Sequence, residues 1–554
     1  MNDIRRTILW VVFGFSLVML WDQWQIHNGK KPTFFPSAAV QTQAPVVPAQ
    51  TKTAEQNAIT QAPAQPPNPA NVSAQVQSPA QLVDVQTDVL KIQLSSEGGS
   101  VLKAELLKHK DMHHADSNML LLDNSAERIY LAQSGLIGGA NNANWPNHKS
   151  AMRFSGQTEL KEGESQFQFK FESDISSDIK LIKTYTLTRG SYAIEVTHEI
   201  VNTSANPVNP QLYVQLVRDG NKPAGESSFY STFTGPAVYT SQKKYQKVEF
   251  ADIEKNKADF EKQSAQGYIA MVQHYFASAW VFEDGVQRDI FARKIENNLY
   301  AVGMVTPVTA IAPGEKQIHK ARLFIGPQEE KTLEAIYPGL ELVKDYGWLT
   351  ILSKPLYWLL YELNRIIANW GWSIVALVIV LKAGFYWLNA QAYQSMAKMK
   401  AINPKIMEMR ERLKDNPQQM QMEMMRIYKE EKVNPLGGCL PIAVQIPFFI
   451  ALYWVLLSSV EMRNAPWIGW VHDLASPDPW FILPLLMTAT SMFQTWLNPT
   501  PPDPIQAKMM WFMPLAFSVM FFFFPAGLVL YWLTNNILSI AQQWMINKKL
   551  GVNN

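Results

Sequence analysis

Among the residues of this 554-residue chain that could do chemistry, Lys382 has the most unusual setting. It is the single charged residue in the apolar run 370–388, which reads WGWSIVALVIVLKAGFYWL. A helix of that length, at about 1.5 Å per residue, can cross a hydrocarbon core of about 30 Å. A lysine there costs roughly 2.5–3.5 kcal/mol at mid-membrane. Either its stem carries the ammonium to the nearer headgroups, or it faces a wet cavity and marks a functional site; we favour the second explanation.

Polar side chains in the later apolar runs could share such a cavity with Lys382. They are Gln445, Ser458, Ser459, Thr488, Thr490, Ser491, Gln494, Ser518, Thr534, Asn535 and Asn536. Hydrogen bonding between helices accounts for most such residues taken singly. Taken together, they predict one cavity open to the cytoplasm. The alternative is a secondary transporter that uses Lys382 as a substrate or proton site, which requires an internal repeat that these spans lack.

The histidines suggest a second kind of chemistry, because some large β-sandwich enzymes process sugars with His and Glu. His198 continues the alternation of a predicted strand, however, and His113 and His114 lie in a polar loop without a suitably spaced acidic partner. A membrane-tethered sugar-active enzyme would need a His/Glu cleft, and the sequence indicates none. We therefore expect no enzymatic activity.

Composition excludes several further classes of function. The lone cysteine, Cys439, rules out an internal disulfide and a cysteine-based metal cluster. No Walker-type phosphate loop and no GxGxxG pattern are present. The formal net charge of +2 carries no nucleic-acid signature. We expect no cofactor, no metal site, no direct DNA binding and no nucleotide-driven pump.

The N-terminal part predicts an anchor followed by a tether. Arg5 and Arg6 precede an apolar stretch at 8–21, and no small-x-small cleavage site follows it. We interpret 1–28 as an uncleaved signal-anchor transmembrane helix with its N-terminus in the cytoplasm. Residues 29–80 are rich in Pro, Ala, Gln, Thr and Ser, which predicts a disordered periplasmic linker.

Residues 81–335 alternate between apolar and polar side chains, as β-strands do. Leu90, Ile92 and Leu94 show this period of two, and a hairpin is predicted around Arg189-Gly190. Because helical patterns are scarce before residue 328, the sequence predicts an all-β sandwich of many strands. Since this domain follows an anchor whose N-terminus is cytoplasmic, we expect it on the periplasmic side.

Residues 340–368 then predict an amphipathic helix. Its apolar stripe is Leu352, Leu356, Leu359, Leu363 and Ile366. Two placements are open: a helix lying on the membrane surface, or a helix packed on the β domain.

We predict a second transmembrane helix at 369–392 and a cytoplasmic helical hairpin at 393–435. Asn403-Pro404 and Asn416-Pro417 each offer an N-cap followed by proline at the first helical position. The apolar stripe Ile402, Ile406, Met409 and Leu413 faces Met420, Met424 and Ile427 in this interpretation.

Residues 436–554 contain four more apolar segments, at about 440–460, 480–497, 509–524 and 528–546. Nine Lys and Arg residues lie between 393 and 435, whereas the loop 461–479 has only Arg463. Because basic loops stay in the cytoplasm, we predict six spans with both termini cytoplasmic.

Long motifs carry a resemblance to a known family. They are KEEKVNPLGGCLPIAVQIP at 429–447, FPAGLVLYW at 524–532, YPGLELVKDYGW at 337–348, NWGWS at 369–373 and MAKMKAINPKIMEMRERL at 396–413. With these motifs the chain resembles the YidC/Oxa/Alb membrane protein insertases along its whole length, in the long Gram-negative form.

The resemblance implies a periplasmic β-supersandwich and a five-helix core around a hydrophilic groove. That groove would receive nascent membrane proteins and release them into the lipid bilayer of the inner membrane, alone or with the Sec translocon. The cytoplasmic hairpin would lie near the ribosome and the signal-recognition-particle pathway. By position, Lys382 stands where many members have arginine, and Gln445, Tyr531 and Trp532 match groove positions; we add Asn535 to this predicted substrate groove.

Overall fold

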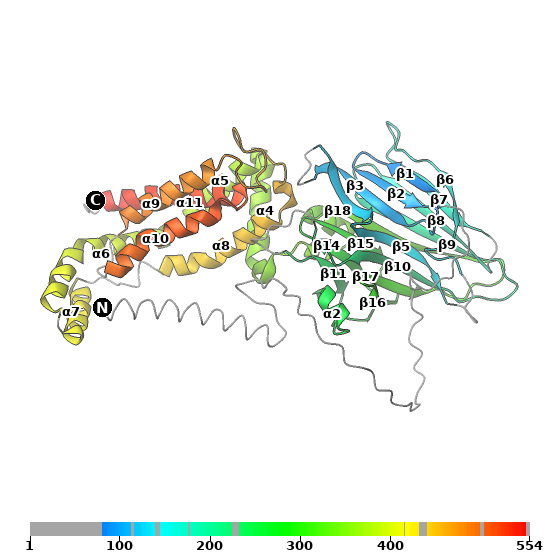
Figure 1. The fold of residues 1–554 in the computed structure, drawn as a ribbon, viewed down its shortest axis with the longest axis horizontal. Coiled ribbons are helices and arrows are strands. Elements are labelled where there is room, and N and C mark those ends of the chain that lie inside the picture. The colour runs from blue at the N-terminus through cyan, green and yellow to red at the C-terminus, as the bar shows by residue number, and fades with distance from the viewer. Residues whose placement is uncertain are drawn as a thin grey trace, which may run out of the picture.

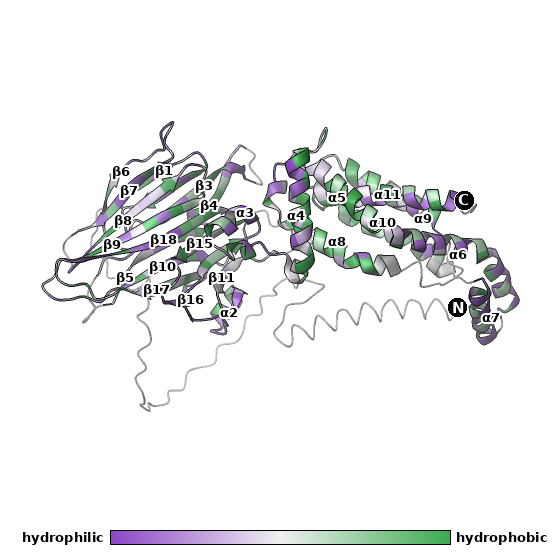
Figure 2. Ribbon diagram, turned by 180° about the vertical axis from the view of Figure 1, so that it is seen from behind, coloured by the Kyte–Doolittle hydropathy of each residue, from purple (hydrophilic) through white to green (hydrophobic). Residues whose placement is uncertain are grey.

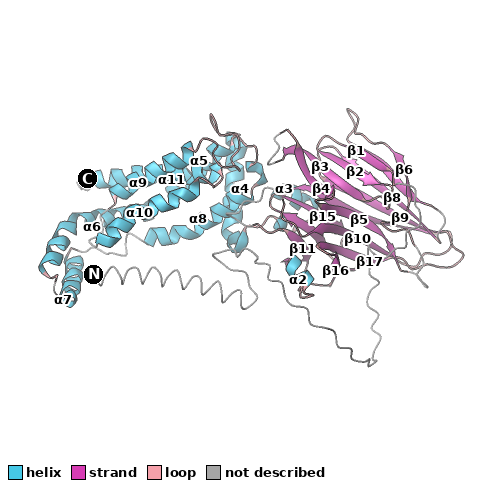
Figure 3. Ribbon diagram, in the orientation of Figure 1, coloured by secondary structure: helices cyan, strands magenta, loops and turns pink. Residues whose placement is uncertain are grey.

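The computed structural model describes residues 80–111, 116–138, 145–174, 178–223, 232–414, 416–431, 440–498 and 504–549. The predicted anchor at 1–28 and all but the last residue of the predicted linker at 29–80 lie outside these ranges, as do His113 and His114. Strands make up one part of the molecule and long helices the other (Figures 1 and 3).

The first sheet of the β domain has nine strands in the order β1-β2-β3-β4-β5-β10-β17-β16-β13. These strands are β1 Leu82–Gln86, β2 Leu90–Ser95, β3 Val101–Lys110, β4 Asn118–Asn124, β5 Ile129–Ile137, β10 Gln211–Asp219, β17 Leu299–Pro307, β16 Arg288–Glu296 and β13 Gln263–Ser264.

The second sheet also has nine strands, in the order β12-β11-β14-β15-β18-β9-β8-β7-β6. They are β12 Lys244–Lys247, β11 Gly235–Thr240, β14 Tyr268–Gln273, β15 Phe276–Phe282, β18 Lys316–Pro327, β9 Ala193–Asn202, β8 Ile179–Thr188, β7 Gln166–Ser173 and β6 Met152–Gly156. The predicted all-β domain is confirmed as two antiparallel sheets.

The two sheets pack face to face through alternate side chains. In β7 the residues Phe167, Phe169 and Phe171 are buried, while the residues between them face outwards. Tyr130 of the first sheet reaches across the core and places its hydroxyl 2.6 Å from Ser278 Oγ of the second. The core is thus mainly apolar, and this hydroxyl pair links its two faces.

The hairpin predicted around Arg189-Gly190 forms between β8 and β9, with Leu187 opposite Ile194. Gly190 has a φ of 71°, the left-handed conformation that favours glycine in tight turns. His198 continues β9 as predicted, is fully buried, and lies 2.9 Å from Ser134 Oγ through its Nε2.

Short helices connect the β domain to the helical part. They are α3 Glu330–Ile336 and the 3-10 turns η2 Leu340–Val343 and η3 Gly347–Leu349, and η4 Val460–Met462 follows α8. A further short helix, α2 Phe250–Glu254, lies within the β domain between β12 and β13. The longer helices are α4 Thr350–Ile367, α5 Trp370–Gly384, α6 Tyr386–Arg412, α7 Pro417–Glu430, α8 Leu440–Ser458, α9 Ile482–Leu497, α10 Pro504–Phe521 and α11 Ala526–Lys549.

Helices α5 and α8 to α11 are mostly hydrophobic, whereas α7 is hydrophilic (Figure 2). Among the described residues, no single helix meets the combined length and hydropathy expected of a membrane span. The pair Trp370–Gly384 and Tyr386–Arg412 meets it jointly, with a bend of 70° between its members. Shorter apolar helices occur at Val444–Ser458, Ile482–Leu497 and Ala507–Phe521.

That bend corrects the prediction of one continuous helix over 369–392. Helix α5 ends at Gly384, and α6 starts again at Tyr386. The sequence run stays apolar up to Leu388, so hydropathy alone gave no sign of the break. A glycine at the end of a helix supplies the physical reason, because its backbone freedom makes helix continuation unfavourable.

The α6–α7 hairpin confirms one of its two predicted caps. The Asn416 side chain accepts a hydrogen bond from Gln419 N, and Pro417 occupies the first turn of α7. No helix begins at Asn403-Pro404, since Pro404 lies inside the continuous helix α6. The predicted stripe is confirmed: Ile402, Ile406 and Met409 pack against Met420, Met424 and Ile427.

Helix α4 stands between the β domain and the other helices (Figure 1). Its buried face is Ser353, Leu356, Tyr357 and Leu360, whereas Ile366 of the predicted stripe is 80% exposed. Leu356 is the residue of the predicted stripe that lies on this buried face. Helix α4 also contacts the connecting helix α3, where Lys331 lies 3.7 Å from Glu362. Its placement on the membrane surface stays a prediction.

The β domain also contacts the end of α8 directly. His274, between β14 and β15, donates through Nε2 to the Leu457 carbonyl over 2.9 Å. Arg463 donates to the Lys110 carbonyl over 2.8 Å. Beside them, the fully buried Lys344 ammonium lies 3.4 Å from Glu461. Three separate contacts thus fix this end of α8.

Candidate functional site

Helix α5 positions the single charged residue of its apolar run. Asn369 caps the helix, because its side chain accepts a hydrogen bond from Trp372 N over 3.0 Å. Lys382 follows in the last turn of the helix, just before the bend. Ile374, Leu377 and Val378 are buried, whereas Ile379 and Val380 are exposed, so one face of this helix packs against the bundle.

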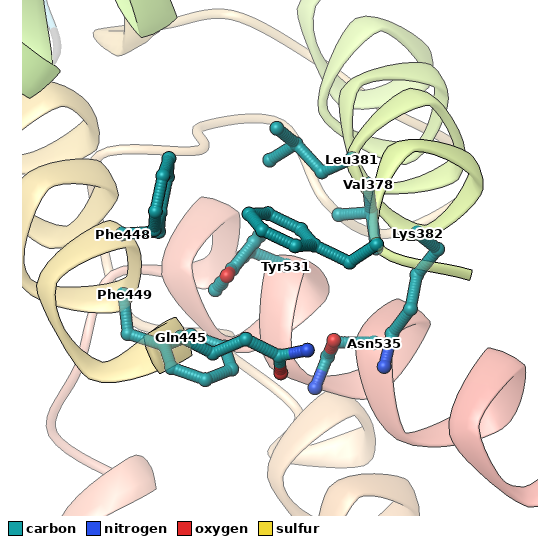
Figure 4. A pocket seen from close by; sticks show the side chains of 9 residues that line it. Val378, Leu381, Lys382, Gln445, Phe448, Phe449, Tyr531 and Asn535 are labelled. Atoms are coloured by element: carbon teal, nitrogen blue, oxygen red, sulfur yellow. The ribbon is translucent and has the colours of Figure 1, made fainter. Parts of the chain in front are cut away.

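Lys382 lines a cavity between α5, α8 and α11. Its other lining residues are Val378, Leu381, Phe385, Gln445, Phe448, Phe449, Tyr531 and Asn535. In Figure 4 the polar ends of Lys382, Gln445 and Asn535 gather on one side of Tyr531. Phe448 lies on the other side of it. The wall is therefore amphipathic, and four of the five predicted groove residues line it.

A second cavity, of about 170 Å³, adjoins the first. The two share Lys382, Gln445, Phe449 and Asn535, which form the neck between them. The second cavity is further lined by Asn389, Ala392, Tyr393, Met396, Gln494, Asn498 and Ser539. We call the pair of cavities the groove. No carboxylate side chain lines either cavity among the described residues.

Hydrogen bonds hold the polar groups at the neck. Lys382 Nζ donates to Ser539 Oγ over 2.7 Å, and Ser539 Oγ donates to the Asn535 carbonyl over 2.7 Å. Gln445 Nε2 donates to Asn389 Oδ1 over 2.6 Å. Because the ammonium meets neutral oxygens rather than an anion, its positive charge remains uncompensated by any described side chain of the groove.

Trp532 is the predicted groove residue that lines neither cavity. Its ring packs against Phe521 at 4.7 Å and stacks on Phe524 at 6.0 Å between centroids. Neighbouring residues on a helix point in different directions, so Tyr531 and Trp532 cannot both face the groove squarely. A groove role for Trp532 stays a prediction without geometric support.

Sequence reasoning missed Asn389 and Ser539, which hold the two neck residues in place. Ser539 lies four residues after Asn535, so the two share one face of α11. Asn389 lies seven residues after Lys382, but on the other side of the bend, in α6. Helical spacing from Asn535 could therefore have found Ser539, whereas the spacing gave no signal for Asn389.

The described residues contain no group of three or more His, Cys, Asp or Glu side chains placed to hold a metal ion. In the β domain, burial lowers the pKa of His198 well below 6.5, so this histidine is neutral inside the sandwich. A fully buried ring has no access to a substrate. The chemistry that the geometry offers is therefore solvation of polar groups in the groove.

Comparisons with known proteins agree over the whole chain. A family model described as the YidC periplasmic domain matches residues 82–359, and one described as 60Kd inner membrane protein matches 362–553. The membrane protein insertase YidC of Ralstonia nicotianae is 53% identical over 100% of this chain and 99% of its own length. That of a Janthinobacterium species is 50% identical over the full length of both chains.

One solved structure, of an active YidC insertase with its first transmembrane domain resolved, matches 84% of this chain and 93% of its own. Its sequence identity of 17% and TM-score of 0.37 are too low to add to the argument. The two family models and the full-length relatives suffice without it. The chain belongs to the YidC family of membrane protein insertases.

Proposed function

We propose that this protein inserts and helps to fold integral membrane proteins of the Gram-negative inner membrane, with the groove as the path of the substrate's polar segment. The observation that carries the proposal is an uncompensated ammonium, Lys382, in an amide-lined cavity among apolar helices. Such a cavity supplies polar partners at a depth where lipid supplies none. The proposed mechanism needs no cofactor.

The transfer step is physical. A short polar segment of the substrate enters from the cytoplasm, and the Lys382 ammonium together with the Gln445 and Asn535 amides replaces part of its hydration. This lowers the desolvation cost of crossing, because only the outer part of the membrane remains dry. The apolar segment then leaves sideways into lipid, where burial at about 25 cal/mol per Å² of apolar surface drives the process.

The proposed topology has six spans, with both termini and the α6–α7 hairpin in the cytoplasm and the β domain in the periplasm. The hairpin and the β domain lie at opposite ends of the helical part, which supports opposite sides of the membrane (Figure 1). Helix α8 has 19 residues, or about 28 Å at 1.5 Å per residue. That length suits the hydrocarbon core.

The partners that we propose follow from this arrangement. Nascent membrane proteins are the substrates, the ribosome and the signal-recognition-particle pathway deliver them near the hairpin, and Sec translocon components share some of them. The nine basic residues at 393–435 support contact with an acidic partner such as ribosomal RNA.

Reconstitution tests the function directly. The purified chain is placed in vesicles of phosphatidylethanolamine and phosphatidylglycerol, and a small single-span protein is synthesised in their presence. We expect protease protection of its translocated segment to require the chain. Equal protection in empty vesicles would contradict the proposal. In cells, depletion of the chain followed by a survey of uninserted membrane proteins would define the substrates.

A further inference from the structure

The second cavity of the groove differs from the first in the chemistry of its wall. Beyond the shared neck, it is lined by carboxamides and hydroxyls, including Asn389, Gln494, Asn498 and Ser539. Its volume of about 170 Å³ exceeds the roughly 30 Å³ that one water occupies in the liquid, so it admits several waters or a short stretch of chain. We call it the amide cavity.

Asn389 is the buried group of this wall with unused bonding capacity. The residue is 4% exposed, and its Oδ1 accepts the hydrogen bond from Gln445. Its Nδ2 has no hydrogen-bond partner among the described residues. A buried donor left unpaired is costly, because it has given up its hydrogen bonds to water. An unpaired donor beside a cavity indicates a place for an acceptor that arrives from outside.

We propose that the amide cavity binds the main chain of the entering segment, and that Asn389 Nδ2 donates to a backbone carbonyl of the substrate. This inference rests on the proposed function and names the group of the groove that would recognise the substrate. Asn389 is here a substrate-binding residue, with the peptide backbone as its ligand.

The charge distribution favours a backbone carbonyl over a carboxylate as the ligand. The groove's cation, Lys382, is held at the neck by Ser539, whereas Asn389, Gln494 and Asn498 are neutral. Neutral amides pair with both the N–H and the C=O of a peptide unit, which almost every residue carries. A site built this way tolerates many sequences, as an insertase with varied substrates requires.

Lys382 and Asn389 would then have separable roles. The ammonium attracts acidic side chains through charge, while the amide recognises the backbone whatever side chains it carries. An uncharged substitution at Asn389 should weaken insertion of acidic and neutral segments equally. A substitution at Lys382 should weaken the acidic one more.

The experiment uses two matched single-span substrates that differ at one position of a short translocated segment, which is Asp in one and Asn in the other. The full-length chain is tested in vesicles of phosphatidylethanolamine and phosphatidylglycerol as wild type, Asn389→Leu, Asn389→Asp and Lys382→Gln. Asn389→Asp keeps the Oδ1 acceptor for Gln445 and removes the donor. Gln391→Leu, at an exposed position of the same helix, is the matched control.

We expect Asn389→Leu to lose about tenfold in insertion rate on both substrates, the equivalent of one hydrogen bond of about 1.4 kcal/mol. Asn389→Asp should lose about tenfold on the Asn substrate and more on the Asp substrate, because its carboxylate also repels an acidic segment. Gln391→Leu should match wild type. Wild-type activity of Asn389→Asp on the Asn substrate would overturn the proposal, because Asn389 would then serve only to accept the hydrogen bond from Gln445. Loss on the Asp substrate alone would overturn it too, because Asn389 would then act through Lys382. If wild type itself inserted neither substrate, the proposed function would fail instead.

Discussion

At the scale of single residues, we propose that the groove depends on the positive charge of Lys382 rather than on the shape of its head group. Among the described residues the ammonium donates to Ser539, and it does not need the planar fork of arginine for that bond. Many family members are expected to carry arginine here, so charge is the property that the two residues share.

We predict that Lys382→Arg retains insertion and that Lys382→Glu impairs substrates with acidic translocated segments most. A carboxylate at this position repels an acidic segment in a medium that screens charge poorly. Insertion rates of matched acidic and neutral substrates measure the effect. Equal activity of the Glu variant on both would remove the electrostatic part of the mechanism.

The contact of His274 with α8 should depend on pH. Burial lowers the pKa of His274 from 6.5 to about 4; the hydrogen bond to Leu457 opposes this shift, and the nearby Arg463 charge adds to it. The histidine is neutral when docked, and a free histidine binds a proton below pH 6.5, so acid favours the undocked state. The docking free energy is fully present above pH 6.5 and falls as the pH drops towards 4, by about 1.4 kcal/mol for each pKa unit.

Spin labels on β14 and α8 would report this change as a growing distance between pH 6.5 and 4. His274→Gln should flatten the part of the pH dependence that His274 contributes. His109 lies near the same Arg463, and burial lowers its pKa to about 4, so it acts with the same sign. A His109→Gln variant separates the two histidines.

Local signals in the sequence predicted elements well where the interactions are local. The Asn416 cap, the β8–β9 hairpin and the facing stripes of α6 and α7 all depend on residues close in sequence. The pairing of β10 with both β5 and β17 could not be predicted, because it joins strands far apart in the chain. The helix start predicted at Asn403-Pro404 is absent, because α6 continues through Pro404. Tertiary packing of α6 outweighs the helix-breaking tendency of that proline.

At the scale of elements, the α6–α7 hairpin is joined to the bundle mainly through the start of α6. The packing core of its two arms is small: Ile402, Ile406 and Met409 with their α7 partners. Small cores and exposed backbone give low local stability. Methionine side chains such as Met422 and Met425 are exposed and adapt to varied apolar partners.

We therefore predict faster hydrogen exchange across 404–432 than in α5, α8 or α11. The measurement is amide exchange on the purified protein in lipid, with α11 as the internal reference. Protection of the hairpin equal to that of α11 would show a rigid strut rather than a mobile receiving element.

The buried pair Lys344–Glu461 is expected to fix α4 against α8. The Lys344 side chain is fully buried, its Nζ lies 3.8 Å from the Tyr357 ring centroid, and the Tyr357 hydroxyl donates to Glu461 over 2.5 Å. Removing one partner of a buried pair costs about 3–5 kcal/mol, whereas replacing both with apolar groups costs far less.

Lys344→Met should consequently lower the temperature of thermal unfolding clearly. The double variant Lys344→Met/Glu461→Leu should recover most of the loss, and Lys344→Arg should cost less than Lys344→Met. Tryptophan fluorescence of the purified protein in detergent checks this order. If the double variant unfolded at the same temperature as Lys344→Met, packing of the lysine stem would contribute more to stability than the charge of its ammonium.

At the scale of the whole molecule, the groove and the β domain occupy different parts of the chain. Two sets of contacts hold the segments before α5 to the end of α8. His274 and Lys110 of the β domain reach the end of α8 and the residues after it. Lys344 and Tyr357 reach Glu461 from the connecting segment and α4. The second set stays in place when the sheets are removed.

This division predicts the outcome of two deletions. Removing 90–325, with the N-terminal segment and 340–368 retained, leaves the groove lining and the Lys344–Glu461 pair intact, so insertion of a simple substrate should remain measurable. Removing 340–368 as well takes away Lys344 and all of α4, including Ser353, which donates to the Ala451 carbonyl of α8 over 3.3 Å. Insertion should then fall much further.

Both deletions must be compared at equal membrane abundance, because loss of α4 also destabilises the bundle. Lys344→Met placed in the shorter deletion supplies the matched control: it breaks the remaining attachment without shortening the chain further. We expect its insertion rate to lie between those of the two deletions. If the 90–325 deletion alone abolished insertion at normal abundance, the sheets would have to act on the groove through His274 and Arg463, and a mechanism confined to the helices would be wrong.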